Sequence, residues 1–291
     1  MASNDNKLYY DKWSSQLKAA HQTNENVYAG LVDTMGMESN RFFWKITGQV
    51  DMASVNNEDS EHGHQDRDYE ERQMQASPAF LALKWEKGEL LRAHADVKSD
   101  WIAASVKAMN RWNAAVIRAA ATGSATAQYE GESSSSAKTL GVDQILGDGT
   151  TNVTEAIVKG IRGRFVKNKA LQSGQKIYYS VSQEEEDALT GIEHFINADY
   201  NQSSAVESGV IAGRLYGVNI VRDQDLTEAS DTRTGFAWVK SGIMFGSQAG
   251  VLTRQDEIQT RHYMDQFYLR VDNGATRTRE TDVMSILTDV A

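Results

Sequence analysis

The sequence predicts an α+β fold, because a long helical pattern stands between segments with strand patterns. The helical pattern runs from Asp96 to Gly123, where apolar residues recur at three- and four-residue offsets. Segments rich in aromatic and β-branched residues precede and follow it, at Phe42–Val50 and His262–Leu287. The region 152–234 combines a second helical pattern with strand patterns. We therefore expect the first and last parts of the chain to share one sheet.

The composition is that of a folded globular protein, and it excludes several classes. Hydrophobic residues make up 40% of the 291 residues and charged residues 24%. The chain has no cysteine, which excludes disulfides and thiol chemistry. No apolar run approaches the roughly 20 residues of a membrane span, and the N-terminus lacks a signal-peptide pattern. The formal charge of −10, from 30 basic and 40 acidic residues, argues against a protein that wraps nucleic acid.

Residues 1–37 form a predicted N-terminal arm, which is polar with widely spaced bulky residues such as Trp13. Such an arm lies either on its own domain or across a neighbouring chain, and the first arrangement is the commoner one. Trp13 is a candidate inter-subunit contact under the second arrangement.

The segment 38–95 has the pattern of an extended hairpin. A strand at Phe42–Val50 is followed by a strongly acidic segment, Glu58–Glu71, which contains a single basic residue. A second stretch with a strand pattern, Ala79–His94, then leads toward the long helix. We expect the two strands to pair and the acidic segment between them to be an exposed loop, because connections of this length are functional or disordered.

Two histidines in the acidic segment, His62 and His64, stand beside carboxylates that are able to ligate a metal. A solvated loop that contains histidines is the favoured interpretation. Neither a third histidine nor the helical H-x-x-x-H spacing accompanies the pair. We therefore predict no metal and no cofactor.

The pattern from Asp96 predicts one long amphipathic helix within the segment 96–151, with Gly123 as a natural stop. Its predicted buried face consists of Ile102, Val106, Met109, Val116 and Ala120, with Trp101, Ala108, Trp112 and Ala115 beside them. After the helix, residues rich in glycine and serine surround two short predicted strands, Thr126–Tyr129 and Thr139–Leu146.

The segment 152–234 is predicted to be a mixed α/β region. A second amphipathic helix is indicated by the spacing of Val153, Ile157, Ile161 and Phe165. This helix carries the most basic part of the chain, including Arg162 and Arg164, which we interpret as a solvated face rather than a nucleic-acid site. A strand at Lys176–Ser182 and a short acidic helix follow. Because neighbouring carboxylates on a helix point apart, we interpret Glu184–Asp187 as solvated first-turn charge.

Glycine-containing turns predict hairpins in the rest of the chain. The glycines within Gly209–Val221 indicate a hairpin or a bent strand. In the final segment, 235–291, the dipeptide Asn273-Gly274 is a strong hairpin signal between two alternating stretches. We therefore expect two C-terminal strands joined at this dipeptide.

The sequence contains no recognised catalytic motif. The patterns G-x-S-x-G, H-E-x-x-H, G-x-G-x-x-G and the Walker loop are absent, and the six histidines are scattered. We expect a protein that is not an enzyme.

Three strings of residues resemble the major capsid proteins of tailed bacteriophages. The first, DVKSDWIAASVKAMNRWNAAVIRAAATGSAT, is similar to the long spine helix of that family, although Lys98 and Asn113 depart from its usual proline and aspartate. The second comprises KIYYSVSQEEEDALTG and SGVIAGRLYGVNIVRDQDL, and the third comprises GFAWVKSGIMFGSQAGVLTRQDE and NGATRTRETDVMSI. The residues that match the second and third family patterns are Gly209, Ile211, Gly217, Val218, Ile220, Gly274, Ala275, Arg277, Val283 and Ile286.

The resemblance implies the tailed-phage major capsid fold, which encapsulins share. An N-terminal arm would occupy residues 1–37, and an extended β-hairpin loop residues 38–95. A peripheral domain would contain the spine helix at 96–151 and return as strands at 235–291. The segment 152–234 would form a mixed α/β axial domain.

The resemblance also implies a structural, self-assembling protein of the icosahedral head shell that encloses double-stranded DNA in the virion. Its partners would be copies of itself in hexamers and pentamers, a portal, a separate scaffolding protein and, as an option, a decoration protein. Packaged DNA would be contacted only non-specifically, no membrane would be involved, and assembly would take place in the host cytoplasm. The candidate inter-subunit contacts are Trp13, Glu70, Glu71, Arg72, Arg162, Arg164, Arg277 and Arg279.

Two alternatives stay open at the level of sequence. An encapsulin-like compartment shell would have the same fold without a DNA-packaging role. An enzyme with a metal at His62 and His64 belongs to a different class, and metal analysis of the purified protein would test it.

Overall fold

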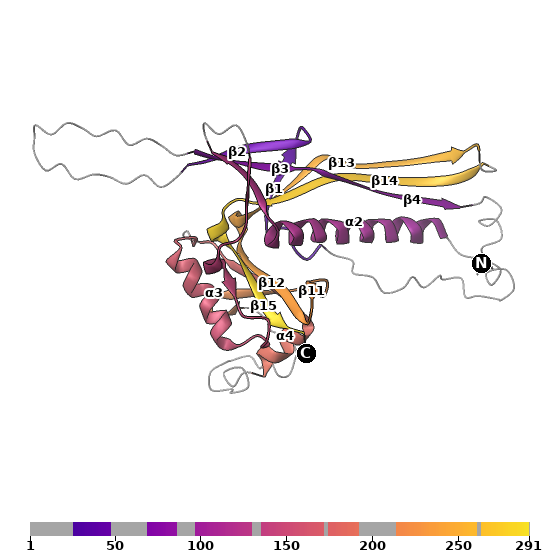
Figure 1. Cartoon of the computed structure of the whole chain (residues 1–291). Coiled ribbons are helices and arrows are strands. Elements are labelled where there is room, and N and C mark those ends of the chain that lie inside the picture. The colour runs from indigo at the N-terminus through magenta and orange to yellow at the C-terminus, as the bar shows by residue number, and fades with distance from the viewer. Residues whose placement is uncertain are drawn as a thin grey trace, which may run out of the picture.

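The computed structural model describes residues 26–47, 69–85, 97–129, 135–171, 174–191, 214–260 and 263–290. Within these residues the protein has two bodies (Figure 1). An elongated slab consists of long strands that lie over the helix α2, and a compact lower body surrounds β12, β15 and two shorter helices. Trp13, His62 and His64 lie outside the described residues, so their predicted roles stay predictions.

The sheet of the slab joins the two ends of the chain, in the order β1-β13-β14-β4. Its strands are β1 (Asp33–Met37), β4 (Ser77–Trp85), β13 (Ile243–Ile258) and β14 (Met264–Arg277). The strands β13 and β14 form a long antiparallel hairpin, β4 pairs antiparallel with β14, and β1 runs parallel to β13. The prediction that the first and last parts of the chain share a sheet is confirmed.

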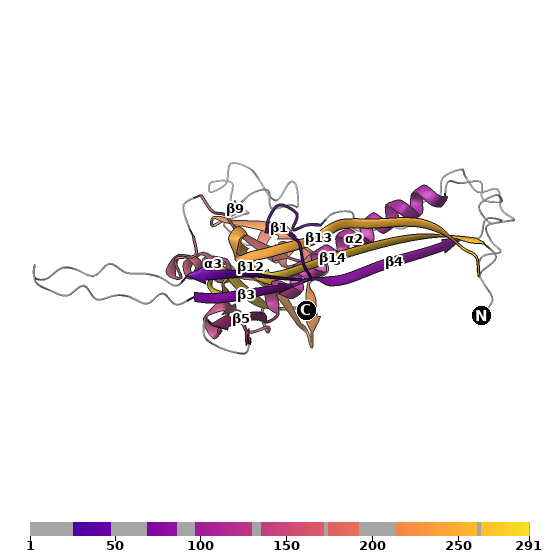
Figure 2. The ribbon, with the colours of Figure 1, turned by 90° about the horizontal axis from the view of Figure 1, so that it is seen from above.

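The predicted long helix is present as α2 (Val97–Thr122), and it lies along one face of this sheet (Figures 1 and 2). Alternate residues of β14 point toward it, and Phe267 and Leu269 are buried there. The rings of Trp85 on β4 and Trp101 on α2 meet edge to face at 5.5 Å. The helix therefore buries one face of the slab in an apolar layer.

The predicted buried face of α2 is only partly right: Trp101 and Met109 pack on the slab, but most of its other members are not buried. Ile102 and Val106 are each 44% exposed, whereas Ala114, Ile117 and Ala121 are buried. The first half of the helix packs on the slab, and the second half packs on the core of the lower body, which lies on a different side of the helix. Because the contact surface moves around the helix, no single stripe at constant helical spacing describes it.

The predicted turn at Asn273-Gly274 is also wrong, since β14 continues through both residues. Asn273 is buried, and its side-chain amide donates a hydrogen bond to the side-chain oxygen of Asn113 on α2, at 2.6 Å. A Cβ atom at Gly274 would lie 2.3 Å from the carbonyl oxygen of Gln75. The glycine therefore permits a close approach of two backbones, and does not form a turn.

A second sheet, in the order β2-β3-β5-β6, lies at the base of the predicted loop. Its strands are β2 (Arg41–Thr47), β3 (Tyr69–Gln75), β5 (Ala125–Tyr129) and β6 (Ser136–Lys138). The predicted pairing of the strand at Phe42 with the strand at Ala79 is wrong, because β2 pairs with β3 while β4 pairs with β14. The end of the acidic segment, including Glu70 and Glu71, is therefore part of a strand.

The lower body is a seven-stranded sheet with two short helices, and its main path runs β7-β15-β12-β8-β10-β9, with β11 paired to β12. The helices are α3 (Glu155–Lys167) and α4 (Gln183–Thr190), and both were predicted. The strands are β7 (Ile145–Leu146), β8 (Ile177–Val181), β9 (Arg214–Leu215), β10 (Val218–Arg222), β11 (Thr227–Ala229), β12 (Thr232–Val239) and β15 (Val283–Asp289). The 3-10 turns are η2 (Val142–Gln144), η3 (Lys240–Gly242) and η4 (Glu280–Asp282).

The core of the lower body forms where α3 packs on this sheet. Ile157, Val158, Ile161 and Phe165 of α3 are buried against Tyr179 and its neighbours. The predicted hairpin within Gly209–Val221 is confirmed for its described part, where Tyr216 and Gly217 turn the chain between β9 and β10 with positive φ values of 50° and 85°.

One of the sequence-based boundaries falls inside packed structure, and the last part of the predicted arm is packed as well. Tyr28 and Val32 belong to a buried core, and β1 ends at Met37, so residues 26–37 pack on their own chain. The boundary between residues 234 and 235 passes through β12, and β15 lies in the same sheet as β8 and β12. The final segment of the chain therefore contributes to both bodies.

The acidic run at the start of α4 is not solvated throughout, which corrects the interpretation of Glu184–Asp187. Glu185 and Glu186 are both fully buried. Glu185 completes a capping box, in which its side chain accepts a hydrogen bond from the backbone N–H of Ser182. Glu186 forms an ion pair with Arg222.

Among the described residues, no helix is both long enough and apolar enough to cross a membrane.

Candidate inter-subunit surfaces

Two of the predicted contact residues, Arg72 and Arg277, are buried within the chain. Arg72 on β3 is 1% exposed and forms two hydrogen bonds of 2.6 Å with the carboxylate of Glu280, and a further ion pair with Glu70. Both arginines therefore have their partners in the same chain, and the inter-subunit hypothesis rests on the other predicted residues.

Arg277 at the end of β14 holds the C-terminal end of α2. Its guanidinium donates hydrogen bonds to the carbonyl oxygens of Ala120, Ala121 and Gly123, and to that of Lys138. A cation at this end is favourable because the last carbonyls of a helix have no partner within the helix. Burial nevertheless lowers the pKa of Arg277 below its ordinary value.

The remaining predicted basic residues lie at or near the surface. Arg162 on α3 and Arg279 before η4 are exposed. Arg164 is partly buried and donates hydrogen bonds to the carbonyl oxygens of Asp143 and Ile145, at 2.6 and 2.8 Å. Arg162 and Arg164 point to different sides of α3, so only part of the basic segment shares one surface.

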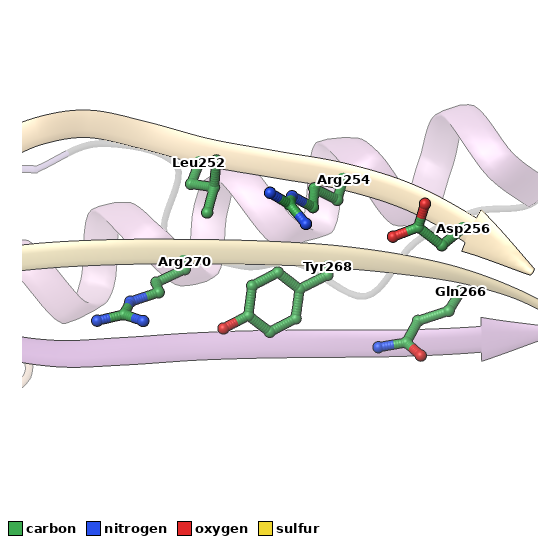
Figure 3. A pocket seen from close by; sticks show the side chains of 6 residues that line it. All are labelled: Leu252, Arg254, Asp256, Gln266, Tyr268 and Arg270. Carbon is green, nitrogen blue, oxygen red and sulfur yellow. The ribbon is translucent and has the colours of Figure 1, made fainter. Parts of the chain in front are cut away.

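No part of the chain that the structure describes covers the face of the slab that points away from α2, and this face was not predicted from the sequence. A shallow pocket on this face is lined by three directly opposed pairs of β13 and β14: Leu252 with Arg270, Arg254 with Tyr268, and Asp256 with Gln266. Figure 3 shows these six side chains on the side of the strands opposite α2. The signal for it was the alternation along β14, in which the buried residues Phe267, Leu269 and Val271 face the helix.

The edge strand β4 extends this uncovered face. Phe80 is 73% exposed and stacks on Tyr268, with ring centroids 6.1 Å apart. No strand among the described residues pairs with the outer edge of β4. An unpaired edge strand beside the exposed ring of Phe80 is a surface on which a second chain can pack.

The side chains that bind metal ions in proteins are a further candidate feature. Within the residues that the structure describes, no group of three histidine, cysteine or carboxylate side chains is placed to hold a metal ion.

A comparison with protein-family models decides the family. The model described as phage capsid protein matches residues 6–290, which is nearly the whole chain. The chain belongs to the phage capsid protein family. It is a structural protein of a capsid shell, as the resemblance of its sequence implied.

Solved capsid structures have the same fold as this capsid protein. The capsid of Ralstonia phage GP4 matches with a TM-score of 0.74 at 9% identity, covering 100% of this chain and 98% of that chain. The capsid of cyanophage P-SCSP1u matches with a TM-score of 0.72 at 13% identity, covering 100% and 96%. The capsid of cyanophage Pam1 matches with a TM-score of 0.70 at 11% identity, covering 100% of both chains. A search of curated protein sequences finds no match.

Proposed function

We propose that this protein is the major capsid protein of a tailed phage, and that its copies form the hexamers and pentamers of an icosahedral shell around double-stranded DNA. The observation that carries this proposal is the uncovered face of the slab. α2 buries one face of β4 and β14, while Phe80 and Leu252 lie exposed on the other, beside the half-buried Tyr268. In a shell, neighbouring copies cover such a face.

The charge of the chain fits a container for DNA. A net charge of −10 disfavours tight binding of phosphates along the inner wall, so the contacts with packaged DNA would be non-specific and weak. The other partners in this proposal are a portal, a separate scaffolding protein and a decoration protein, with assembly in the host cytoplasm.

Electron microscopy of the purified full-length protein tests this function. We expect negative staining to show closed shells of uniform size, either from the protein alone or after coexpression with the candidate scaffold of the same phage. Monomers or dimers that persist with the scaffold would contradict the proposal.

Substitutions on the uncovered face of the slab test whether this face is needed for shell formation. Phe80→Ser removes the exposed ring and is expected to lower the yield of shells at least tenfold without changing the unfolding temperature of the free chain. Ala82→Ser, at another exposed position of β4, is the matched control and is expected to assemble normally. Equal yields for the two variants would show that this face is not used in assembly.

A further inference from the structure

The outward face of α3 has an unexplained glycine at its centre. Ile157, Val158, Ile161 and Phe165 face the core, so the helical period places Lys159, Gly163, Val166 and Lys167 on the opposite side. A Cβ atom at Gly163 would meet no other atom within 4 Å, so packing within the chain does not require a glycine there. An interior glycine weakens a helix relative to alanine, and this one brings no compensating contact inside the chain.

The residues around Gly163 form what we call the basic face: Lys159, Arg162, Gly163, Val166 and Lys167. Val166 is 57% exposed, and the three basic side chains are exposed as well. Lys159 pairs with Glu155 of the same helix at 2.6 Å, so Arg162 and Lys167 carry most of the positive charge of this face. An apolar side chain and a glycine beside these cations make a surface that another backbone can approach closely.

A separate, acidic surface of the lower body forms what we call the acidic patch: Glu184, Asp187 and Glu228. All three residues are exposed, and they lie on α4 and on β11. Arg233 is the cation that pairs with two of them, at 2.5 Å from Glu184 and 2.6 Å from Glu228. Because one buried guanidinium is shared between two carboxylates, the patch keeps an excess of negative charge.

The positions of the two surfaces determine how they can meet. Figure 1 shows α3 on one side of the lower body and β11 on the other, with α4 at the bottom, and Leu189 of α4 packs in the same core as α3. Among the described residues, no ion pair or hydrogen bond joins the basic face to the acidic patch of the same chain. A contact between the basic face of one copy and the acidic patch of the next is head-to-tail. Repeating it gives a closed ring when the rotation from one copy to the next divides a full turn evenly.

We propose that the basic face of α3 in one copy packs against the acidic patch of the next copy, and that this contact joins subunits side by side around a ring. This inference rests on the proposed shell function and names the two surfaces that the partner copies use. Gly163 and Val166 form the closely packed centre, and the charges around them set the register and favour this pairing over contacts between like surfaces.

Charge reversal on each surface tests the pairing. The double variant Arg162→Glu/Lys167→Glu reverses the charge of the basic face. The double variant Glu184→Lys/Asp187→Lys reverses the charge of the acidic patch and keeps the ion pair between Glu228 and Arg233. Each pair of changes is expected to lower shell yield at least tenfold under conditions where the wild-type chain assembles. The chain with all four changes is expected to recover most of that loss.

Several outcomes would overturn the pairing. Normal assembly of either double variant would contradict it. A variant with all four changes that assembles no better than the two double variants would contradict it as well. If adding Glu58→Lys and Glu61→Lys restored the shell yield of the Arg162→Glu/Lys167→Glu chain, the partner of the basic face would be the acidic segment instead. A wild-type chain that forms no shell, even with its scaffold, would instead contradict the proposed function itself.

Gly163 gives an independent test of close packing. Gly163→Leu is expected to raise the unfolding temperature of the free chain, because leucine is the better helix former, and to reduce shell yield at least tenfold. Ala119→Leu, at an exposed position of α2, is the matched control for added bulk. Shells from the Gly163→Leu chain at the wild-type yield would show that α3 is not packed against a neighbour.

Discussion

Arg72 on β3 and Glu280 before β15 form a two-pronged ion pair, in which both N–O distances are 2.6 Å. The pair joins the sheet at the base of the extended loop to the turn that leads into the C-terminal strand. Burial alone would raise the pKa of Glu280, but the hydrogen bonds and the charge of Arg72 outweigh this effect and hold the pKa below its ordinary value. The ionised pair therefore stabilises the fold above the ordinary glutamate pKa, and this contribution is lost as the pH falls.

The first prediction concerns this pair. Arg72→Met is expected to lower the free energy of unfolding by about 3–5 kcal/mol, because it leaves the Glu280 carboxylate partly buried without its cation. Urea unfolding of the free chain at neutral pH measures the loss. The double variant Arg72→Met/Glu280→Leu is the control and is expected to lose less, since Glu70 is then the single carboxylate of the cluster that is left without Arg72. A larger loss in the double variant would contradict this account.

A second prediction concerns the pH dependence of stability through Glu185. Burial raises the pKa of its carboxyl group, and hydrogen bonds from Thr288 and Ser182 together with the charge of Arg233 oppose that shift only in part. The ionised form is therefore disfavoured in the folded chain, and its contribution to stability falls as the pH rises through the raised pKa. Glu185→Gln is expected to raise the unfolding temperature more at about pH 8 than at about pH 5.

Thermal unfolding of the wild-type chain and the Glu185→Gln chain across this pH range makes the comparison. Thr288→Val is a useful companion, because it removes the hydroxyl that bonds to the Glu185 carboxyl at 2.6 Å without removing the carboxyl itself. An effect of Glu185→Gln that is independent of pH would mean that the group does not titrate as stated.

The third prediction concerns the close approach at Gly274. Gly274→Ala is expected to cost about 1–3 kcal/mol of stability, because the new methyl group would overlap the backbone of Gln75. Gly36→Ala is the matched control, since an added Cβ at Gly36 on β1 meets no atom within 4 Å. Denaturant midpoints of the two variants give the result, and equal midpoints would contradict the close contact.

A fourth prediction tests which side of α2 is buried. Ile117→Ala is expected to lower the free energy of unfolding of the free chain by about 2–5 kcal/mol, since Ile117 is fully buried. Ile102→Ala, at a position that is 44% exposed, is expected to change it by less than about 1 kcal/mol. Urea unfolding distinguishes the two, and a reversed order would restore the face predicted from the sequence.

Local patterns in the sequence predicted local structure well. The spacing of Val153, Ile157, Ile161 and Phe165 indicated α3, and all four side chains are buried. The alternation of KIYYSVS indicated β8, and the glycines of the next segment indicated the hairpin of β9 and β10. Each of these features depends on neighbours in the chain, which a single sequence contains.

Features that depend on distant parts of the chain were not predictable in the same way. The buried side of α2 depends on two different bodies that it contacts in turn. The straight course of β14 through Gly274 depends on the backbone of Gln75, and the burial of Glu186 depends on Arg222. The uncovered face of the slab was missed because the sequence does not show which side of β4 and β14 the helix occupies.

The arrangement of α2 has a mechanical consequence. Its 26 residues span about 39 Å, and its two halves pack on different bodies of the same protomer. A load applied to the slab from a neighbouring copy therefore reaches the lower body along a rod of hydrogen-bonded turns. Arg277 fastens the end of that rod to two further strands. In a shell filled under pressure, α2 would act as a strut that spreads strain across the subunit instead of concentrating it at one joint.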